Sequence, residues 1–109
     1  MVKAMVLLHR RPGMSSQEFR EYTDRKHLEM LWQLPGLRRL IINYGLPGPD
    51  GEPAYDAIGE DWFDNAEAMG AAFASPAGQA LMADAPNFLD MSRFQVVVVE
   101  EQEVPAPVG

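Results

Sequence analysis

The sequence contains no cysteine. This absence excludes disulfide bonds, thiolate nucleophiles and metal sites with cysteine ligands. Histidine is scarce as well, because His9 and His27 are the only two and stand eighteen residues apart in different predicted elements. They form no metal-ligand pattern, and no glycine-rich phosphate loop precedes a predicted helix. We therefore expect no metal and no cofactor, and a cysteine-free chain fits a cytoplasmic protein.

Basic residues are also few. Nine Lys and Arg stand against sixteen Asp and Glu, which gives a net charge of −7. Nucleic acid is excluded as a partner, because phosphate binding needs clustered basic side chains. A membrane span is excluded too, because no apolar run approaches the roughly 20 residues that it requires. Hydrophobic residues nevertheless make up 47% of the chain, which is typical of a globular protein.

Capping and stop signals divide the chain into strands and helices. Ser15 with Glu18 and Asp64 with Glu67 are capping boxes that predict two helix starts. A Ser-Pro pair at 75–76 predicts the start of a further short helix. The predicted strands span residues 2–9, 37–46, 56–63 and 92–101, and the predicted helices span residues 16–34, 65–74 and 76–85.

The order β-α-β-β-α-β, with a helical insertion before the last strand, predicts the ferredoxin-like arrangement of the α+β class. Two right-handed crossovers place the helices on one face of a four-stranded antiparallel sheet. The other face stays open, and the first and last strands carry apolar residues on both sides. We therefore expect a homodimer that pairs through the sheet face. Residues 1–101 form a single domain in this interpretation, and residues 102–109 form an extended or disordered tail.

His27 is the outstanding residue of the first predicted helix. It lies in the middle of an apolar stripe with helical spacing, which contains Phe19, Thr23, His27, Met30, Leu31 and Leu34. One interpretation is a half-buried histidine that is hydrogen-bonded to the backbone. The other is a general acid or base facing a cavity, because the ordinary pKa of histidine is about 6.5.

The third strand and the second strand offer further candidates. One face of the third strand carries Ile58, Glu60 and Trp62, and the other carries Ala57, Gly59, Asp61 and Phe63. We expect the face with Glu60 and Trp62 to lie beside His27. Glu60 is either a solvated carboxylate or a buried one that needs a partner. Tyr44 on the second strand either packs plainly or donates a hydrogen bond to a ligand.

These segments together resemble the EthD-like group of the dimeric α/β-barrel superfamily. The resemblance is carried by MVKAMVLLHRRPGMSSQEFREY, the helical His27, LPGLRR, DAIGEDWF, FASPAGQALMAD and FLDMSR in that order. It implies a ferredoxin-like protomer that pairs through its sheet, with a pocket between sheet and helices. It also implies a functional role for His27. Thr23 and Leu40 stand where aromatic residues are common in the family.

Three functions follow from this interpretation. In the first, His27 and Glu60 carry out cofactor-independent acid/base chemistry on a compact hydrophobic molecule, such as a lactone, a phenol or a polyketide fragment. The reaction is an isomerisation, a cyclisation or a monooxygenase-type oxidation, and the substrate contacts are Tyr44, Trp62, Met30 and Thr23. In the second, the same pocket belongs to a non-catalytic binding or carrier protein for a hydrophobic metabolite in a degradation pathway. In the third, the chain is a structural dimer without a ligand.

Overall fold

The structure, a computed structural model, describes residues 1–108; the last residue of the predicted tail, Gly109, lies outside them. Its main elements are β1 (Val2–Leu8), α1 (Ser16–Tyr22), a π-helical segment (Thr23–His27), α2 (Leu28–Leu31), β2 (Arg39–Tyr44), β3 (Ala57–Phe63), α3 (Ala66–Ala74), α4 (Pro76–Asp84) and β4 (Gln95–Glu100). Two short 3₁₀ turns, Ala85–Asn87 and Met91–Arg93, lie between α4 and β4.

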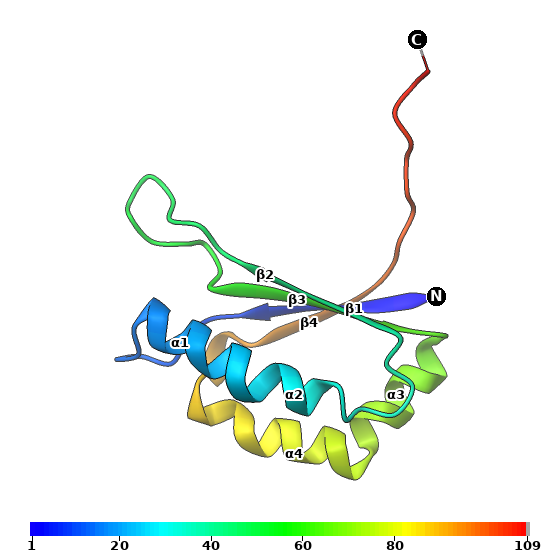
Figure 1. Cartoon of the computed structure of the whole chain (residues 1–109), viewed down its shortest axis with the longest axis horizontal. Coiled ribbons are helices and arrows are strands. Elements are labelled where there is room, and N and C mark those ends of the chain that lie inside the picture. The colour runs from blue at the N-terminus through cyan, green and yellow to red at the C-terminus, as the bar shows by residue number, and fades with distance from the viewer. Residues whose placement is uncertain (109) are drawn as a thin grey trace.

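The four strands form one antiparallel sheet in the order β2-β3-β1-β4. All helices cover the same face of this sheet, and the other face is open (Figure 1). This is the predicted ferredoxin-like fold of the α+β class. Residues 101–108 contain no helix or strand and leave the end of β4 on the open side of the sheet (Figure 1). Within the described residues, no helix is long and apolar enough to cross a membrane.

Local sequence signals explain most helix starts. The Ser15 hydroxyl accepts from the backbone N–H of Glu18 at 3.1 Å, and the Glu18 carboxylate accepts from the backbone N–H of Ser15 at 3.0 Å, as the capping box predicts. Ser75 caps α4, which begins at a proline as predicted. The predicted cap of α3 is wrong by one residue. Asn65 is the cap, because the Asp64 carboxylate pairs with Arg38 at 3.0 Å instead.

The first predicted helix is interrupted. It begins at Ser16 as expected, but Thr23–His27 winds as a π-helix, and the regular helix ends at Leu31. The Thr23 hydroxyl donates to the Phe19 carbonyl four residues earlier at 2.8 Å, and such bonds favour bending of a helix. A π turn adds one residue to the helical repeat. His27, at the end of this segment, is therefore turned relative to its place on a regular helix.

The strand register separates an inner row from an outer row. Ala4 pairs with Asp61 and Val6 with Gly59, whereas Met5 pairs with Glu60. Ala4, Gly59 and Asp61 are buried against the helices. The last strand begins later than predicted, at Gln95, because Asp90 caps a 3₁₀ turn over Met91–Arg93 through the backbone N–H of Ser92 at 3.1 Å.

The core between sheet and helices consists of two clusters. The first contains Ala4, Leu31, Leu34, Phe63, Met69, Ala72 and Leu81. The second contains Leu8, Phe19, Ala57, Ala85, Phe88 and Leu89. Val6 packs against both clusters. The space between them contains the candidate site.

Candidate functional site

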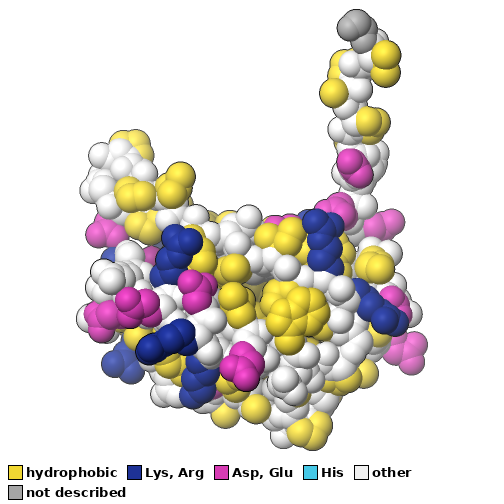
Figure 2. Space-filling view, viewed as in Figure 1, with side chains coloured by type: hydrophobic (Ala, Val, Ile, Leu, Met, Phe, Trp, Pro, Cys, Tyr) yellow, Lys and Arg dark blue, Asp and Glu magenta, His cyan; other side chains and the backbone are white. Residues whose placement is uncertain are grey.

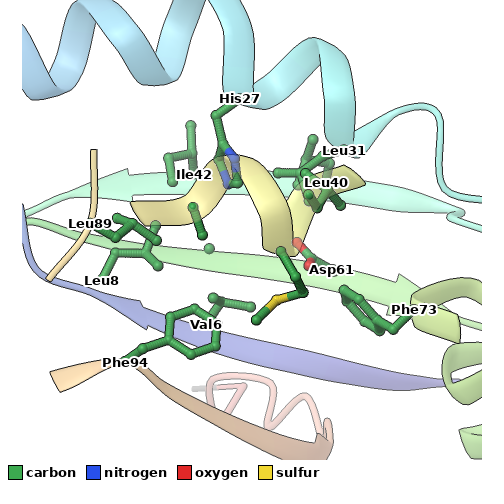
Figure 3. Close-up of a pocket in the computed structure, with 14 residues that line it drawn as sticks. Val6, Leu8, His27, Leu31, Leu40, Ile42, Asp61, Phe73, Leu89 and Phe94 are labelled. Carbon is green, nitrogen blue, oxygen red and sulfur yellow. The ribbon is translucent and has the colours of Figure 1, made fainter. Parts of the chain in front are cut away.

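A cavity of about 50 Å³ lies between the two core clusters, with the sheet as its floor and the helices as its roof (Figure 3). It is lined by Val6, Leu8, His27, Leu31, Leu40, Ile42, Gly59, Asp61, Phe73, Leu81, Met82, Ala85, Leu89 and Phe94. On the scale on which one water needs roughly 10–15 Å³, this volume limits the cavity to a small, compact ligand. Met82 is 48% exposed and also lines the cavity, so the cavity reaches the surface beside α4.

His27 enters the cavity from the helix layer. Figure 3 shows its imidazole pointing from the helix toward the sheet. The helix that carries it crosses the face shown in Figure 2, and of the described residues no histidine side chain is visible on that face. The imidazole packs against Phe88, with ring centroids 4.8 Å apart and planes inclined by 52°. The π-helical segment and this aromatic contact together set the direction of the imidazole.

The carboxylate of Asp84 on α4 is bound to residues on the helix that carries His27. The Tyr22 hydroxyl donates to Asp84 at 2.7 Å, Lys26 pairs with it at 2.9 Å, and the Asn87 amide donates to it at 3.0 Å. Burial by itself would raise the pKa of Asp84, but these three partners outweigh it and hold the pKa below its ordinary value. Asp84 thereby joins α4 to the segment just before His27.

The imidazole of His27 is poor in polar contacts. Its Nδ1 is buried and has no hydrogen-bond partner. Burial lowers the pKa of His27 to about 4, against a weaker opposing effect of the Asp84 charge. His27 is therefore neutral at pH 7. Nδ1 therefore makes no hydrogen bond to the backbone, and the imidazole is part of the cavity lining.

Asp61 enters the same cavity from the sheet. It is 1% exposed, and its Oδ1 has no hydrogen-bond partner. Figure 3 shows the carboxylate pointing up from β3 into the cavity. Burial raises its pKa to about 7. The sequence analysis missed this residue, because the neighbouring row of β3 contains a carboxylate as well, Glu60, and the sequence does not show which row faces the helices.

Gly59 helps to create the cavity floor. A methyl group at this position would lie 3.7 Å from Val6 Cβ, 3.9 Å from Asp61 Oδ1 and 4.0 Å from Ile42 Cδ1. These are ordinary van der Waals distances, so the space above Gly59 is large enough for a methyl group. The cavity therefore exists partly because this residue has none.

The predicted position of Glu60 and Trp62 beside His27 is wrong. Both lie on the open face of the sheet, because neighbouring strand residues point to opposite sides and Asp61 faces the helices. Glu60 accepts from Lys3 at 2.8 Å and from the Asn43 amide at 2.9 Å. Trp62 lies between Lys3 and Arg39, whose charged groups are 4.7 and 4.6 Å from the ring centroid. Neither residue lines the cavity.

The remaining predicted contact residues also lie outside the cavity lining. Thr23 is fully buried and uses its hydroxyl on the Phe19 carbonyl. Met30 packs against the first core cluster. Tyr44 faces the helices near the end of β2, where its hydroxyl donates to Asp24 at 2.5 Å. Burial raises the pKa of Tyr44, and the Asp24 carboxylate adds to that effect. Of the six predicted site residues, His27 is the one that lines the cavity.

The described residues form no candidate metal site. Among residues 1–108, no group of three or more His, Asp or Glu side chains has an arrangement that could hold a metal ion. His27 and Asp61 are the two titratable residues among those lining the cavity.

Comparison with known proteins identifies the family. The sequence matches the EthD domain over residues 11–92. The chain belongs to the EthD family. It is 33% identical over 89 residues to an uncharacterised 11.0 kDa protein from the thcB-thcC intergenic region of Rhodococcus erythropolis, which covers 80% of this chain and 84% of that one.

Solved structures show the same fold. An EthD family protein from Bacillus halodurans matches with a TM-score of 0.78 at 24% identity, over 94% of this chain and all of the other. A protein of unknown function from Bacteroides fragilis, described as dimeric with a ferredoxin-like fold, matches with a TM-score of 0.67 at 17% identity, over 92% and 95% of the two chains. At these identities the likeness shows the EthD fold and nothing about ligands.

Proposed function

We propose that this EthD protein binds a compact hydrophobic organic molecule in the cavity and that His27 takes part in cofactor-independent acid/base chemistry on it. The supporting observation is the unpartnered Nδ1 of His27 in a cavity that is otherwise almost entirely apolar. A buried polar atom without a partner is costly, and a bound ligand can supply one. A lactone, a phenol or a small polyketide-like fragment has the required character, and the reaction is of the isomerase, cyclase or oxidoreductase type.

Phenol is a suitable first probe for binding. We expect it to shift the ¹³C-methyl NMR signals of Val6, Leu8, Leu31 and Leu81, which line the cavity. The methyl groups of Val97 on the open face serve as the internal control, because Val97 pairs with Met5 in the outer row. Shifts at Val97 with none in the cavity would contradict this location.

A carrier function is the second candidate. It is favoured by the low pKa of His27, because a base with a pKa near 4 is poorly matched to proton abstraction at neutral pH. A His27→Phe variant separates the two functions. If the protein is an enzyme, the variant still binds small apolar molecules but loses turnover; if it is a carrier, neither the wild type nor the variant turns any of them over.

We also propose that the protein is a homodimer that pairs through the open sheet face. Val97, 48% exposed, lies on this face with Met5 and Leu7 beside it on β1. An uncovered apolar sheet face is typical of an association surface. The dimeric description of the Bacteroides fragilis structure supports this pairing by analogy.

A further inference from the structure

Asp61 is a buried carboxyl group whose position packing alone does not explain. It lies on the inner row of β3, where its strand partners are Ala4 on β1 and Leu40 on β2. Neither partner offers it a charge or a hydrogen bond, and its Oδ1 is unpartnered. Burying a carboxyl group without a partner costs free energy that an apolar residue at this position would not. A function for the acid in the cavity accounts for its presence.

The charges around the cavity restrict the ligand. From the helix layer the titratable group facing Asp61 is His27, which is neutral at pH 7. Asp84 of α4 influences His27 but is already occupied by Tyr22, Lys26 and Asn87. Among the lining residues, all within the described part of the chain, there is no Lys or Arg. An anionic ligand would find no counter-charge there, and a cationic one would have to leave water for an almost entirely apolar lining with Asp61 as its one acidic partner, so a neutral ligand fits best.

The two polar groups differ in what each can do with a proton. Burial raises the pKa of Asp61 to about 7, so its neutral and its ionised form both occur near neutral pH. Burial lowers the pKa of His27 to about 4, so its imidazole stays neutral and keeps one N–H. A proton-transfer group works best when its pKa is near the working pH. Asp61 meets this condition and His27 does not.

We propose that Asp61 is a second catalytic residue of the cavity, and that it removes a proton from the carbon next to the carbonyl of a neutral ligand. In this arrangement His27 does not act as the base. Its unpartnered Nδ1 carries the imidazole proton and donates a hydrogen bond to the ligand's carbonyl oxygen. The proposal rests on the proposed function of the cavity and names its substrate class: small, neutral, enolisable carbonyl compounds.

The step balances without a cofactor or a co-reactant. The C–H bond breaks and an O–H bond forms on the Asp61 carboxylate. The electron pair moves into the new C=C bond, and the carbonyl oxygen takes the negative charge, which the N–H of His27 stabilises. Asp61 then returns the proton to the same carbon, or to a conjugated carbon of an unsaturated ligand. The second course moves a double bond and is an isomerisation.

The direct test is the rate of α-hydrogen exchange of cyclopentanone in D₂O, followed by ¹H NMR with the full-length protein. We expect the wild type to accelerate exchange, with a rate that rises with pH and levels off above a midpoint near 7. The Asp61→Asn variant is expected to lose about 10²-fold or more of this acceleration together with its pH dependence. His27→Phe is expected to lose roughly 10²-fold and to keep the midpoint. Asp64→Asn, an exposed aspartate outside the cavity, is the matched control and leaves the profile unchanged.

Each alternative outcome contradicts a different statement. If Asp61→Asn keeps the wild-type rate and midpoint, Asp61 is not the base, although the cavity can still be the site. If His27→Phe abolishes the pH dependence and the wild-type midpoint lies near 4, the roles of the two residues are reversed. If the wild type gives no acceleration, the proposed function fails and Asp61's role fails with it. The wild-type midpoint alone tests the proposal should Asp61→Asn not fold.

Discussion

His27 and Asp61 face one small apolar cavity from opposite layers, the imidazole from the helices and the carboxyl group from the sheet (Figure 3). Each has a buried polar atom without a partner. Burial moves their pKa values in opposite directions, to about 4 for His27 and to about 7 for Asp61. Both residues are therefore more often uncharged in the folded protein than in the unfolded chain, with consequences for stability as well as for chemistry.

The first prediction concerns stability against pH. Folded Asp61 binds more protons than unfolded Asp61 between about pH 4 and 7, so its contribution to the free energy of unfolding falls as pH rises through that range. The pKa of His27 is lowered, so its contribution is present above about pH 6.5 and is lost as pH falls toward 4. The two effects oppose each other in the wild type.

Single substitutions separate these effects. Relative to the wild type, Asp61→Asn should gain stability as pH rises from 4 to 8, by on the order of 2–4 kcal/mol. His27→Phe should gain relative stability as pH falls from 6.5 to 4. Urea denaturation from pH 4 to 8 measures both differences. A difference for Asp61→Asn that does not change with pH would show that Asp61 has the same pKa in the folded protein as in the unfolded chain.

The second prediction concerns the cavity floor. Gly59→Ala places a methyl group in free space at ordinary contact distances from Val6 and Ile42. We expect stability to be unchanged or raised by about 0.4–1 kcal/mol, because alanine restricts the unfolded chain more than glycine does. Binding of phenol and exchange of cyclopentanone should both weaken, because the cavity becomes smaller. Full binding in a stable Gly59→Ala protein would place the ligand elsewhere.

The third prediction compares two aspartates that pair with a cation. Asp84 is 7% exposed and joins α4 to Tyr22 and Lys26, whereas the Asp64 side chain is 51% exposed and pairs with Arg38. Asp84→Asn should lower the free energy of unfolding by about 1–3 kcal/mol, because Tyr22, Lys26 and Asn87 lose a buried, charged acceptor. Asp64→Asn should change it by less than about 1 kcal/mol. Equal effects in chemical denaturation would mean that Asp84 does not anchor the helix.

The fourth prediction tests the proposed dimer. Val97 and Val98 are neighbours on β4 with similar exposure, 48% and 54%, but they point to opposite sides of the sheet. Val97→Asp introduces a charge on the open face and should shift the protein to a monomer in sedimentation velocity. Val98→Asp is the matched control and should leave the dimer intact. Dissociation by Val98→Asp and not by Val97→Asp would place the interface on the other side of β4.

The sequence predicted the fold well because its signals are local and periodic. A capping residue, a proline stop or an apolar strand can each be recognised from a few consecutive residues. Together these signals determine the order of the elements and hence the sheet topology. The position of His27 on the inner stripe was predicted for the same reason. The π turn over Thr23–His27 was not, because it depends on a shift of one residue that apolar spacing does not reveal.

The second polar residue of the site could not be chosen from the sequence alone. Both rows of β3 contain one carboxylate, one aromatic residue and one or more small or apolar residues, so the pattern does not show which row faces the helices. The register settles the question by pairing Asp61 with Ala4 in the inner row and Glu60 with Met5 in the outer row. Glu60 and Asp61 are adjacent and point to opposite sides of the sheet, so the register alone places Asp61 in the cavity.

The most direct measurement is a ¹³C NMR titration of the aspartate carboxyl groups in the full-length protein, from pH 4 to 9. We predict one carboxyl group with a midpoint near 7, and we predict that this signal is missing in Asp61→Asn and present in Asp64→Asn. Such a signal would establish an acid in the cavity that can exchange protons at neutral pH. If every aspartate instead titrates below about pH 5, Asp61 is an ordinary ionised carboxylate and the proposed proton transfer is contradicted.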